Sequence, residues 1–331
     1  MNFNLNSLGA IVKVYPNIFS NNPLDRVSDL RSDPQWVSDT MLKDHAIVTP
    51  FWRGKPFVSK IKNLTSGHSD VNQASPAWFP FDFFKKRVLE QCEIIFLGLL
   101  NEPKDMAFFS IDISEISNPE EELGLKDLGS FEDLMLLAPQ AIDAGELAML
   151  GQAKGIFEWN NSHKFCSKCG EKSEMHEAGY KRICNNCSTE HFPRTDPVVI
   201  MLAKFENTAF LGRQKRFPPG MYSALAGFIE HGESIEEAVA RELKEEAGIT
   251  ILDAKYHSSQ PWPFPNSLMI GCIADAESNQ FKLDEVELDE GRWFNREELK
   301  DALNGGSKTD FFVPPPMAIA HHLVKAFVEQ D

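Results

Sequence analysis

Residues 227–249 read GFIEHGESIEEAVARELKEEAGI. Within this stretch Ser234 can serve as a helix N-cap, because Glu237 follows three residues later and completes a capping box. Gly248 suits the left-handed backbone conformation that commonly ends a helix. The stretch therefore predicts a helix from about Ile235 to Ala247.

Three glutamates lie close together on this predicted helix. At roughly 100° per residue, Glu242, Glu245 and Glu246 project from one side, while Leu243 and Ala247 lie on another and can pack inward. Like charges so close are unfavourable unless a cation lies among them. Oxygen ligands on a rigid helix suit Mg²⁺ or Mn²⁺, which also bind substrate phosphates. We therefore expect a divalent cation here, and the sequence leaves the choice between Mg²⁺ and Mn²⁺ open.

The spacing of the stretch matches the Nudix box, G-x5-E-x7-R-E-U-x-E-E-x-G-U, in which U is aliphatic. Every position is occupied, including Gly227, Glu233 and Arg241. A solvent-facing acidic helix is the alternative, but it gives no reason for these residues at these offsets. The stretch thus resembles the Nudix hydrolases, which implies hydrolysis of a nucleoside diphosphate linked to another group. Glu233 and Arg241 are expected to pair and hold loop and helix in register.

Four of the six cysteines form the pattern Cys166-x2-Cys169-x14-Cys184-x2-Cys187. Two CxxC pairs at this separation predict a structural Zn²⁺ ion bound by four thiolates. Disulfides in a secreted domain are the alternative. They conflict with the start of the chain, MNFNLN, which lacks the basic and apolar segments of a signal peptide.

Size and charge narrow the class of protein. A chain of 331 residues is long enough for two or three domains. The net charge of −16 argues against broad electrostatic binding of nucleic acid, although the segment 164–216 is mildly basic. No stretch approaches the ~20 apolar residues of a membrane span. We therefore expect no membrane partner and a cytoplasmic location.

Residues 259–267 read SQPWPFPNS, in which prolines alternate with aromatic residues and favour an extended backbone. Such a loop, taken alone, is more often a packing element or a peptide ligand. Here it resembles the SQPWPFPxS motif of the NADH pyrophosphatase family, whose Nudix domain follows a zinc ribbon. The entry FPRTDP at 192–197 and the prolines at 314–316 also resemble that family, and the similarity extends over about 163–327.

The resemblance implies an activity and a fold. The activity is metal-dependent hydrolysis of the pyrophosphate of NADH or NAD⁺ to nicotinamide mononucleotide and AMP, and also removal of the NAD cap from RNA 5′ ends. The residues do not rank these substrates. The alternatives are a Nudix hydrolase of ADP-ribose or dinucleoside polyphosphates, and a zinc-ribbon module that binds nucleic acid.

The expected fold is α+β. We expect a separate, mostly β N-terminal domain over 1–130, a connecting helix over 131–160, a zinc ribbon over 161–193 and a Nudix hydrolase domain over 194–331. The last is expected to be an α/β/α sandwich with a mixed sheet. Runs such as 46–51, 93–98 and 106–111 are typical of strands, and no internal repeat is visible.

Carried over by position, the resemblance also implies roles for single residues. The catalytic residues would be Glu242, Glu245 and Glu246, with Glu246 as the base that activates water. These three, Glu287 and the backbone carbonyl of Ala226 would bind Mg²⁺ or Mn²⁺. Glu290 is an alternative to Glu287.

The substrate side of the site rests on the same resemblance. Phe228 is expected to stack on a nucleotide base, together with Phe192 contributed by the partner subunit of a homodimer. The remaining expected substrate contacts are Ala226, Gln260, Trp262, Phe264 and Ser267. On composition alone, each aromatic residue here could equally be a core residue.

Overall fold

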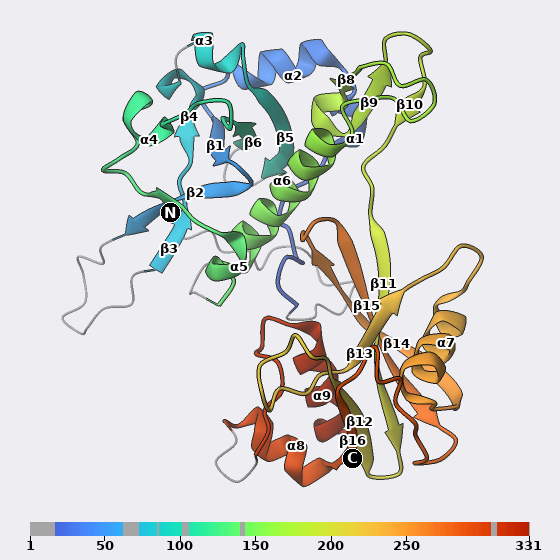
Figure 1. Ribbon diagram of the computed structural model, residues 1–331. Coiled ribbons are helices and arrows are strands. Elements are labelled where there is room, and N and C mark those ends of the chain that lie inside the picture. Colours follow the sequence, from blue (N-terminus) through green and yellow to red (C-terminus); the bar gives the residue numbers. More distant parts are fainter. Residues whose placement is uncertain are drawn as a thin grey trace, which may run out of the picture. The chain divides into compact units, whose positions relative to one another are not determined.

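The computed structural model describes residues 17–61, 73–84, 86–100, 106–139, 143–305 and 310–330. The chain forms two compact units (Figure 1), which are treated separately below. The N-terminal unit holds Phe19–Arg194 and Pro263–Asn266, and the C-terminal unit is built mainly from Thr195–Trp262 and Ser267–Asp331. Residues 1–16, where we expect no signal peptide, lie outside the described residues. Among those described, no helix has both the length and the apolar character that crossing a membrane requires.

The C-terminal unit is built on a mixed sheet in the order β14-β15-β11-β12-β16. Its central strand β11 runs parallel to β15 and antiparallel to β12 and to the short β13. The strands are β11 (Asp196–Phe205), β12 (Thr208–Arg213), β13 (Leu225–Phe228), β14 (Ile251–Trp262), β15 (Ser267–Ala276) and β16 (Glu290–Asn295). Strand β14 lies at the edge, where Pro261 is tolerated because no further strand needs its missing N–H.

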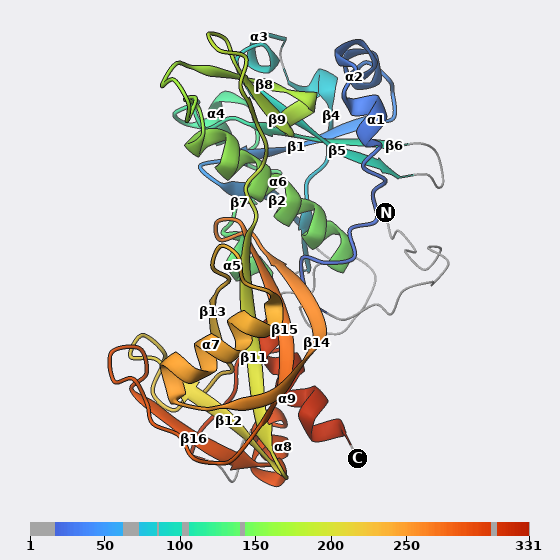
Figure 2. The ribbon, with the colours of Figure 1, turned by 90° about the vertical axis from the view of Figure 1, so that its right-hand side faces the viewer.

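Helices cover both faces of this sheet (Figure 2). Successive residues of β11 point to opposite faces, so Val199 and Met201 pack with α7 (Ile235–Ala247), whereas Ile200 and Leu202 pack with α8 (Arg296–Leu303) and α9 (Ile319–Glu329). Both strand faces are therefore buried. The predicted α/β/α sandwich with a mixed sheet is confirmed.

Helix α7 has the bounds that the sequence predicts. The backbone N–H of Glu237 donates to Ser234 Oγ at 3.2 Å, and the Glu237 carboxylate accepts from the Ser234 N–H at 2.7 Å. At the other end, Gly248 takes a left-handed φ of 66° and bonds back to the helix carbonyls. The capping box and the terminal glycine thus delimit the helix as expected.

The N-terminal unit contains a sheet in the order β3-β2-β1-β6-β5, which confirms a separate β-rich part of the chain. Its strands are β1 (Ala46–Trp52), β2 (Lys55–Ile61), β3 (Gln73–Pro76), β4 (Phe79–Pro80), β5 (Glu93–Leu100), β6 (Met106–Asp112) and β7 (Ser130–Phe131). Its helical segments are α1 (Ser28–Arg31), α2 (Pro34–Met41), η1 (Phe81–Phe83), α3 (Lys86–Leu89), α4 (Pro119–Glu122), α5 (Leu134–Leu137) and α6 (Ala144–Ser162).

The segment 131–160 does not form one connecting helix. It begins in β7, which pairs with β2, and continues into the short α5 and the long α6. Asp143 caps α6, accepting from the backbone N–H groups of Gly145 and Glu146 at 2.9 and 3.1 Å. A side-chain acceptor at the N-cap starts a new helix, which the apolar periodicity alone does not reveal.

The cysteine-rich segment forms a three-stranded sheet of β8 (Ser173–His176), β9 (Lys181–Cys184) and β10 (Glu190–His191), and η2 (Glu177–Gly179) lies between β8 and β9. The buried Arg182 joins it to α6. Its guanidinium donates to Ser173 Oγ at 2.9 Å and to Asn160 Oδ1 at 3.0 Å. This segment therefore belongs with the N-terminal unit rather than standing alone.

The two units share a pattern of strand pairing. Strand β1 is parallel to β6 and antiparallel to β2 and β4, just as β11 is parallel to β15 and antiparallel to β12 and β13. Likewise β5 pairs with β6 as β14 does with β15. Where the C-terminal unit has α7 between β13 and β14, the N-terminal unit has only η1 and the four-residue α3 between β4 and β5. The repeat is visible in topology and not in sequence.

Candidate functional site

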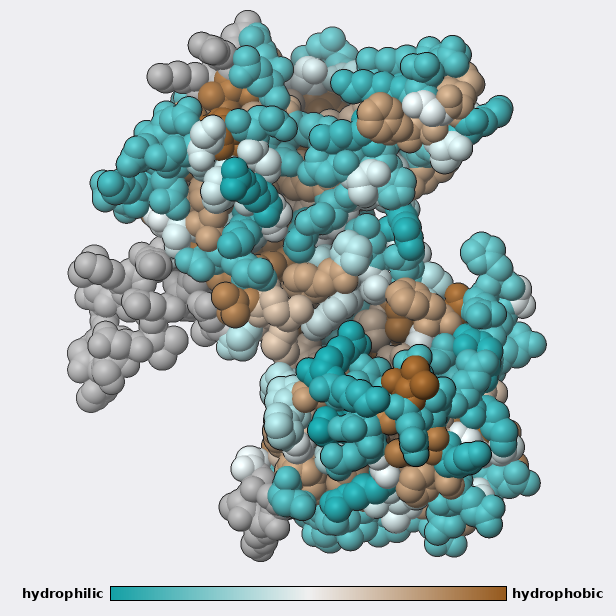
Figure 3. Space-filling view, in the orientation of Figure 1, coloured by the Kyte–Doolittle hydropathy of each residue, from teal (hydrophilic) through white to brown (hydrophobic). Residues whose placement is uncertain are grey.

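The carboxylates of α7 differ in exposure. Glu246 is 6% exposed and the side chain of Glu242 is 12% exposed, whereas that of Glu245 is 62% exposed. The region over α7 is almost entirely hydrophilic on the surface seen in Figure 3. The structure therefore places one glutamate inside the unit, one at its margin and one in solvent.

Arg241 links these glutamates to the preceding loop. Its guanidinium donates to both oxygens of Glu233, at 2.5 and 2.9 Å, and to Glu242 Oε1 and Glu245 Oε2, at 2.8 and 3.0 Å. It also donates to the carbonyl of Phe228 at 2.9 Å. The bidentate pair holds the pKa of Glu233 down at about 2. The predicted pairing of Glu233 with Arg241 is confirmed.

Gly227 lies directly against Glu242. A Cβ atom at this position would stand 1.9 to 2.2 Å from the three atoms of the Glu242 carboxyl group. Only glycine leaves room for that carboxylate against β13. The glycine that opens the Nudix box is therefore required by close approach, not by a turn.

Of the three glutamates on α7, Glu246 has the carboxylate in the least favourable environment. Its pKa is raised to about 8, first by burial and then by the nearby charges of Glu242 and Glu287. Among the described residues, no group hydrogen-bonds to its buried Oε2 atom. An unpartnered carboxylate oxygen among other carboxylates is the environment that a hard divalent cation would satisfy. This environment suits a divalent cation.

Glu287 and Glu290 differ in their surroundings. The charge of Glu287 acts on Glu246. Glu290 instead accepts a hydrogen bond from the Tyr222 hydroxyl and lies 3.4 Å from Arg213 Nε. Asp284, which no motif marks, also acts on Glu246, and its backbone N–H donates to the Glu246 carbonyl at 2.9 Å. Only its position in the acidic segment 284–290 could have drawn attention to it.

The four cysteines converge. Their sulfur atoms all lie within 4.8 Å of one another, with Cys166 and Cys187 3.7 Å apart and Cys169 and Cys184 3.4 Å apart. A tetrahedron with Zn–S bonds of about 2.3 Å has edges of about 3.8 Å. The set therefore fits a Zn²⁺ ion bound by four thiolates.

Gln260 is buried beside the start of α9. The residue is 1% exposed, and its amide donates to the Met317 carbonyl at 2.9 Å and accepts from the Ile319 N–H at 2.9 Å. Both ends of the amide are thus used at the start of α9. These hydrogen bonds hold the start of α9 in place, and substrate contact by Gln260 stays a prediction.

The other predicted substrate residues lie in varied settings. Phe228, at the end of β13, is 62% exposed, whereas Ala226 on the same strand is half-buried. Trp262 ends β14 opposite Ser267, which begins β15. In the N-terminal unit, Phe264 packs edge-on against Phe19 with ring centroids 5.9 Å apart. In that unit also, Phe192 is 59% exposed, with Lys181 Nζ 5.5 Å from its ring centroid.

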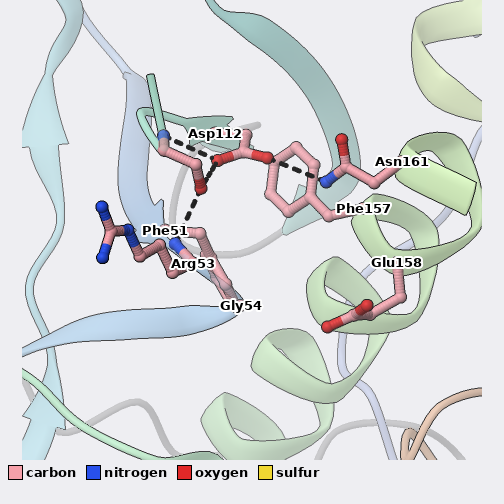
Figure 4. A pocket seen from close by; sticks show the side chains of 8 residues that line it. Phe51, Arg53, Gly54, Asp112, Phe157, Glu158 and Asn161 are labelled. Atoms are coloured by element: carbon pink, nitrogen blue, oxygen red, sulfur yellow. Dashed lines mark hydrogen bonds between the residues drawn. The ribbon is translucent and has the colours of Figure 1, made fainter. Parts of the chain in front are cut away.

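A cavity of about 270 Å³ lies in the N-terminal unit at the ends of β1 and β6 (Figure 4). On its wall, the Asp112 carboxylate accepts from the Ser114 backbone and hydroxyl and from the Asn161 amide, at 2.9, 2.5 and 3.1 Å. Glu158, facing the same space, pairs with Lys154 at 2.8 Å. None of the predicted site residues lines this cavity, and its acidic groups are paired with neighbours.

Three family models match consecutive parts of the chain. They are an NADH pyrophosphatase-like rudimentary NUDIX domain over 45–159, an NADH pyrophosphatase zinc ribbon domain over 161–192 and a NUDIX domain over 193–311. The first of these agrees with the shared strand pairing of the two units.

Whole-chain relatives are similar as well. The human NAD-capped RNA hydrolase NUDT12 is 36% identical over 342 residues, which cover 94% of this chain and 73% of that protein. The NAD-capped RNA hydrolase of Schizosaccharomyces pombe is 31% identical, covering 95% and 93%. The human mitochondrial NAD(P)H pyrophosphatase NUDT13 is 39% identical, covering 67% and 65%.

Proposed function

Because the chain belongs to the NADH pyrophosphatase family of Nudix hydrolases, we propose that it hydrolyses the pyrophosphate bond of NADH or NAD⁺, giving nicotinamide mononucleotide and AMP. One observation carries the chemistry in this chain: the buried, unpartnered Oε2 of Glu246 beside Glu242 and Glu287. The choice of substrate rests on the SQPWPFPNS segment at 259–267, which matches the motif of this family.

We propose that Glu242, Glu245, Glu246, Glu287 and the Ala226 carbonyl hold Mg²⁺ or Mn²⁺. When bound, the cation would neutralise the diphosphate and polarise one phosphorus centre. Glu246 would also take the proton of the attacking water, through the carboxylate oxygen that does not face the cation. The engagement of Glu290 by Tyr222 and Arg213 supports Glu287 as the later ligand.

The test is product analysis under single-turnover conditions with Mg²⁺ or Mn²⁺. Wild type should release nicotinamide mononucleotide from NADH or NAD⁺, and Glu246→Gln should lose at least 100-fold in rate, as expected for loss of a general base. The control is Glu236→Gln, which changes an exposed glutamate in the first turn of the same helix. Cleavage of ADP-ribose or dinucleoside polyphosphates alone would contradict the proposed substrate. No cleavage at all would favour the nucleic-acid-binding module.

Removal of the NAD cap from RNA is part of the proposal. Lys168 and Lys172 of the zinc ribbon are exposed and have no ion-pair partner among the described residues, so their charge is available to phosphates. Replacing both with glutamine should slow hydrolysis of NAD-capped RNA several-fold and weaken its salt dependence, with NADH hydrolysis unchanged. Equal effects on both substrates would contradict this role.

We further propose that the enzyme is a homodimer in which Phe192 acts on the partner's site. Mixing Glu246→Gln and Phe192→Ala subunits distinguishes the two arrangements. If Phe192 acts across the dimer, each mixed dimer has one intact site and regains activity. If Phe192 acts within its own subunit, no mixed dimer does. If light scattering gives the mass of a monomer, the proposed homodimer is contradicted.

Two further expectations stay proposals. The boundary near 193, between the zinc ribbon and the Nudix domain, is testable by limited proteolysis and mass spectrometry of the fragments, whereas the boundaries at 130 and 160 fall inside the N-terminal unit. A cytoplasmic location is testable by imaging a tagged chain, and matters because one similar protein is named as mitochondrial.

A further inference from the structure

The acidic segment 282–290 is attached at both ends. At its start, the backbone N–H groups of Lys282 and Asp284 donate to the carbonyls of Ala247 and Glu246, at 2.8 and 2.9 Å, so the segment begins on the C-terminal end of α7. Within it, the N–H of Glu287 donates to the Asp284 carbonyl at 3.2 Å and forms a turn. Glu287 therefore depends on both attachments for its position.

The far end of the segment is held by Arg213 of β12. Arg213 Nη2 lies 2.8 Å from Asp289 Oδ2 and Nε lies 3.4 Å from Glu290 Oε1. The Arg213 carbonyl accepts from the Asp289 N–H at 2.8 Å. The Arg213 side chain is only 14% exposed, whereas the side chains of Asp289 and Glu290 are 37% and 53% exposed, so the arginine is the buried partner of these pairs. A planar fork with two carboxylate partners restrains direction as well as distance.

Tyr222 completes this attachment. Its hydroxyl donates to Glu290, and its ring packs on Phe294 and Phe311 with centroids 5.1 and 6.1 Å away. Burial, and then the hydrogen bond to Glu290, raise the pKa of Tyr222 to about 12, so the hydroxyl stays a donor. The carboxylate of Glu290 is thus fixed from two sides.

Resting on the proposed function, we infer that Arg213 and Tyr222 are positioning residues for the cation site: by holding Asp289 and Glu290 they set the place of Glu287 opposite Glu246. Neither side chain contacts the carboxylates of α7 in any recorded interaction among the described residues. They act through the segment that bears Glu287. Asp289 and Glu290 thereby have a structural role in that segment, which is distinct from binding the cation.

The direct test is binding of Mn²⁺, followed by the electron paramagnetic resonance signal of the free ion, which needs no substrate. Arg213→Met should weaken Mn²⁺ binding about 10-fold, because the segment loses the two ion pairs that orient Asp289 and Glu290 and keeps only its backbone pairing with β12. Arg213→Lys keeps one ion pair but not both and should lie between wild type and Arg213→Met. Tyr222→Phe, which keeps the ring packing, should weaken binding about 2- to 3-fold. The matched control is Lys204→Met on β11, whose ammonium pairs with Asp275 at 2.5 Å and should not matter for Mn²⁺.

A double-mutant cycle separates positioning from general destabilisation. If Arg213 acts through Glu287, then Arg213→Met adds nothing to the loss already caused by Glu287→Gln. Additive losses would overturn the inference, and so would Mn²⁺ binding of wild-type strength in an Arg213→Met protein that melts like wild type in EDTA. If Arg213→Met fails to fold, the Tyr222→Phe and Arg213→Lys proteins decide in the same way.

The result is independent of the substrate. A wild-type protein that binds Mn²⁺ but leaves NADH intact would refute the proposed function and leave this inference standing. Unchanged Mn²⁺ binding in Glu246→Gln and Glu287→Gln would refute the cation site itself, and the inference with it.

Discussion

At the scale of single residues, the burial of Glu246 lowers the stability of the metal-free protein. The carboxyl group is buried next to other carboxylates, and its pKa is raised to about 8. The folded state therefore keeps a proton that the unfolded chain loses near its ordinary pKa of about 4.3. Stability must fall as the pH rises through this window and level off above pH 8.

Glu246→Gln should remove this penalty. In EDTA, the mutant should gain stability over wild type as the pH rises from 5 to 8, reaching about 2–4 kcal/mol, because the amide needs no ionisation. Urea unfolding at several pH values measures the difference. Glu236→Gln, on the exposed part of the helix, should follow wild type, and a parallel pH dependence of Glu246→Gln and wild type would contradict the prediction.

Gly227 is a second residue whose identity has a local physical cause, because its backbone lies directly against the Glu242 carboxyl group. In Gly227→Ala the new methyl group would overlap the Glu242 carboxyl group, which must move. We expect Mn²⁺ affinity to fall at least 10-fold while the circular dichroism spectrum is retained. Wild-type affinity in a folded Gly227→Ala protein would show that Glu242 is not needed as a ligand.

At the scale of elements, local signals delimit the helices. The C-terminal unit contains two capping boxes of the same form, Ser234 with Glu237 at α7 and Asn295 with Glu298 at α8. Of these two helices, only α7 bears predicted site residues. The two helices therefore allow stability and function to be separated.

Ser234→Ala and Asn295→Ala should each destabilise the C-terminal unit by about 1 kcal/mol, because each removes one helix cap. Ser234→Ala alone should also weaken Mn²⁺ binding, since fraying of the first turn loosens Arg241 from Glu233. Thermal unfolding and Mn²⁺ titration of the two variants are the measurements. Equal Mn²⁺ affinities would mean that the end of α7 does not influence the site.

At the scale of the whole molecule, the zinc ribbon belongs to the N-terminal unit through Arg182 and α6. Structural zinc contributes directly to folding. Loss of zinc should therefore lower the stability of the N-terminal unit.

Cys184→Ala should reduce zinc content well below one ion per chain and lower the melting temperature of the N-terminal unit. The control is Cys272→Ala, which removes a buried thiol from β15 in the C-terminal unit and should leave zinc content unchanged. Elemental analysis with calorimetry measures both. A full equivalent of zinc in Cys184→Ala would contradict the four-thiolate site.

The sequence by itself determined the features whose cause lies within a few residues. The capping box of Ser234, the terminal Gly248 and the two CxxC pairs depend on fixed short spacings, and the structure has them as predicted.

Only the tertiary structure decided what depends on residues far apart in the chain. Gln260 is buried against α9, which its motif does not reveal. Glu290 is engaged by Tyr222 and Arg213, which lie some 70 residues earlier in the chain. The repeated strand pairing of the two units is likewise a property of contacts. The physical reason is the same in each case: burial and pairing are set by neighbours in space, and many different sequences can build the same neighbourhood.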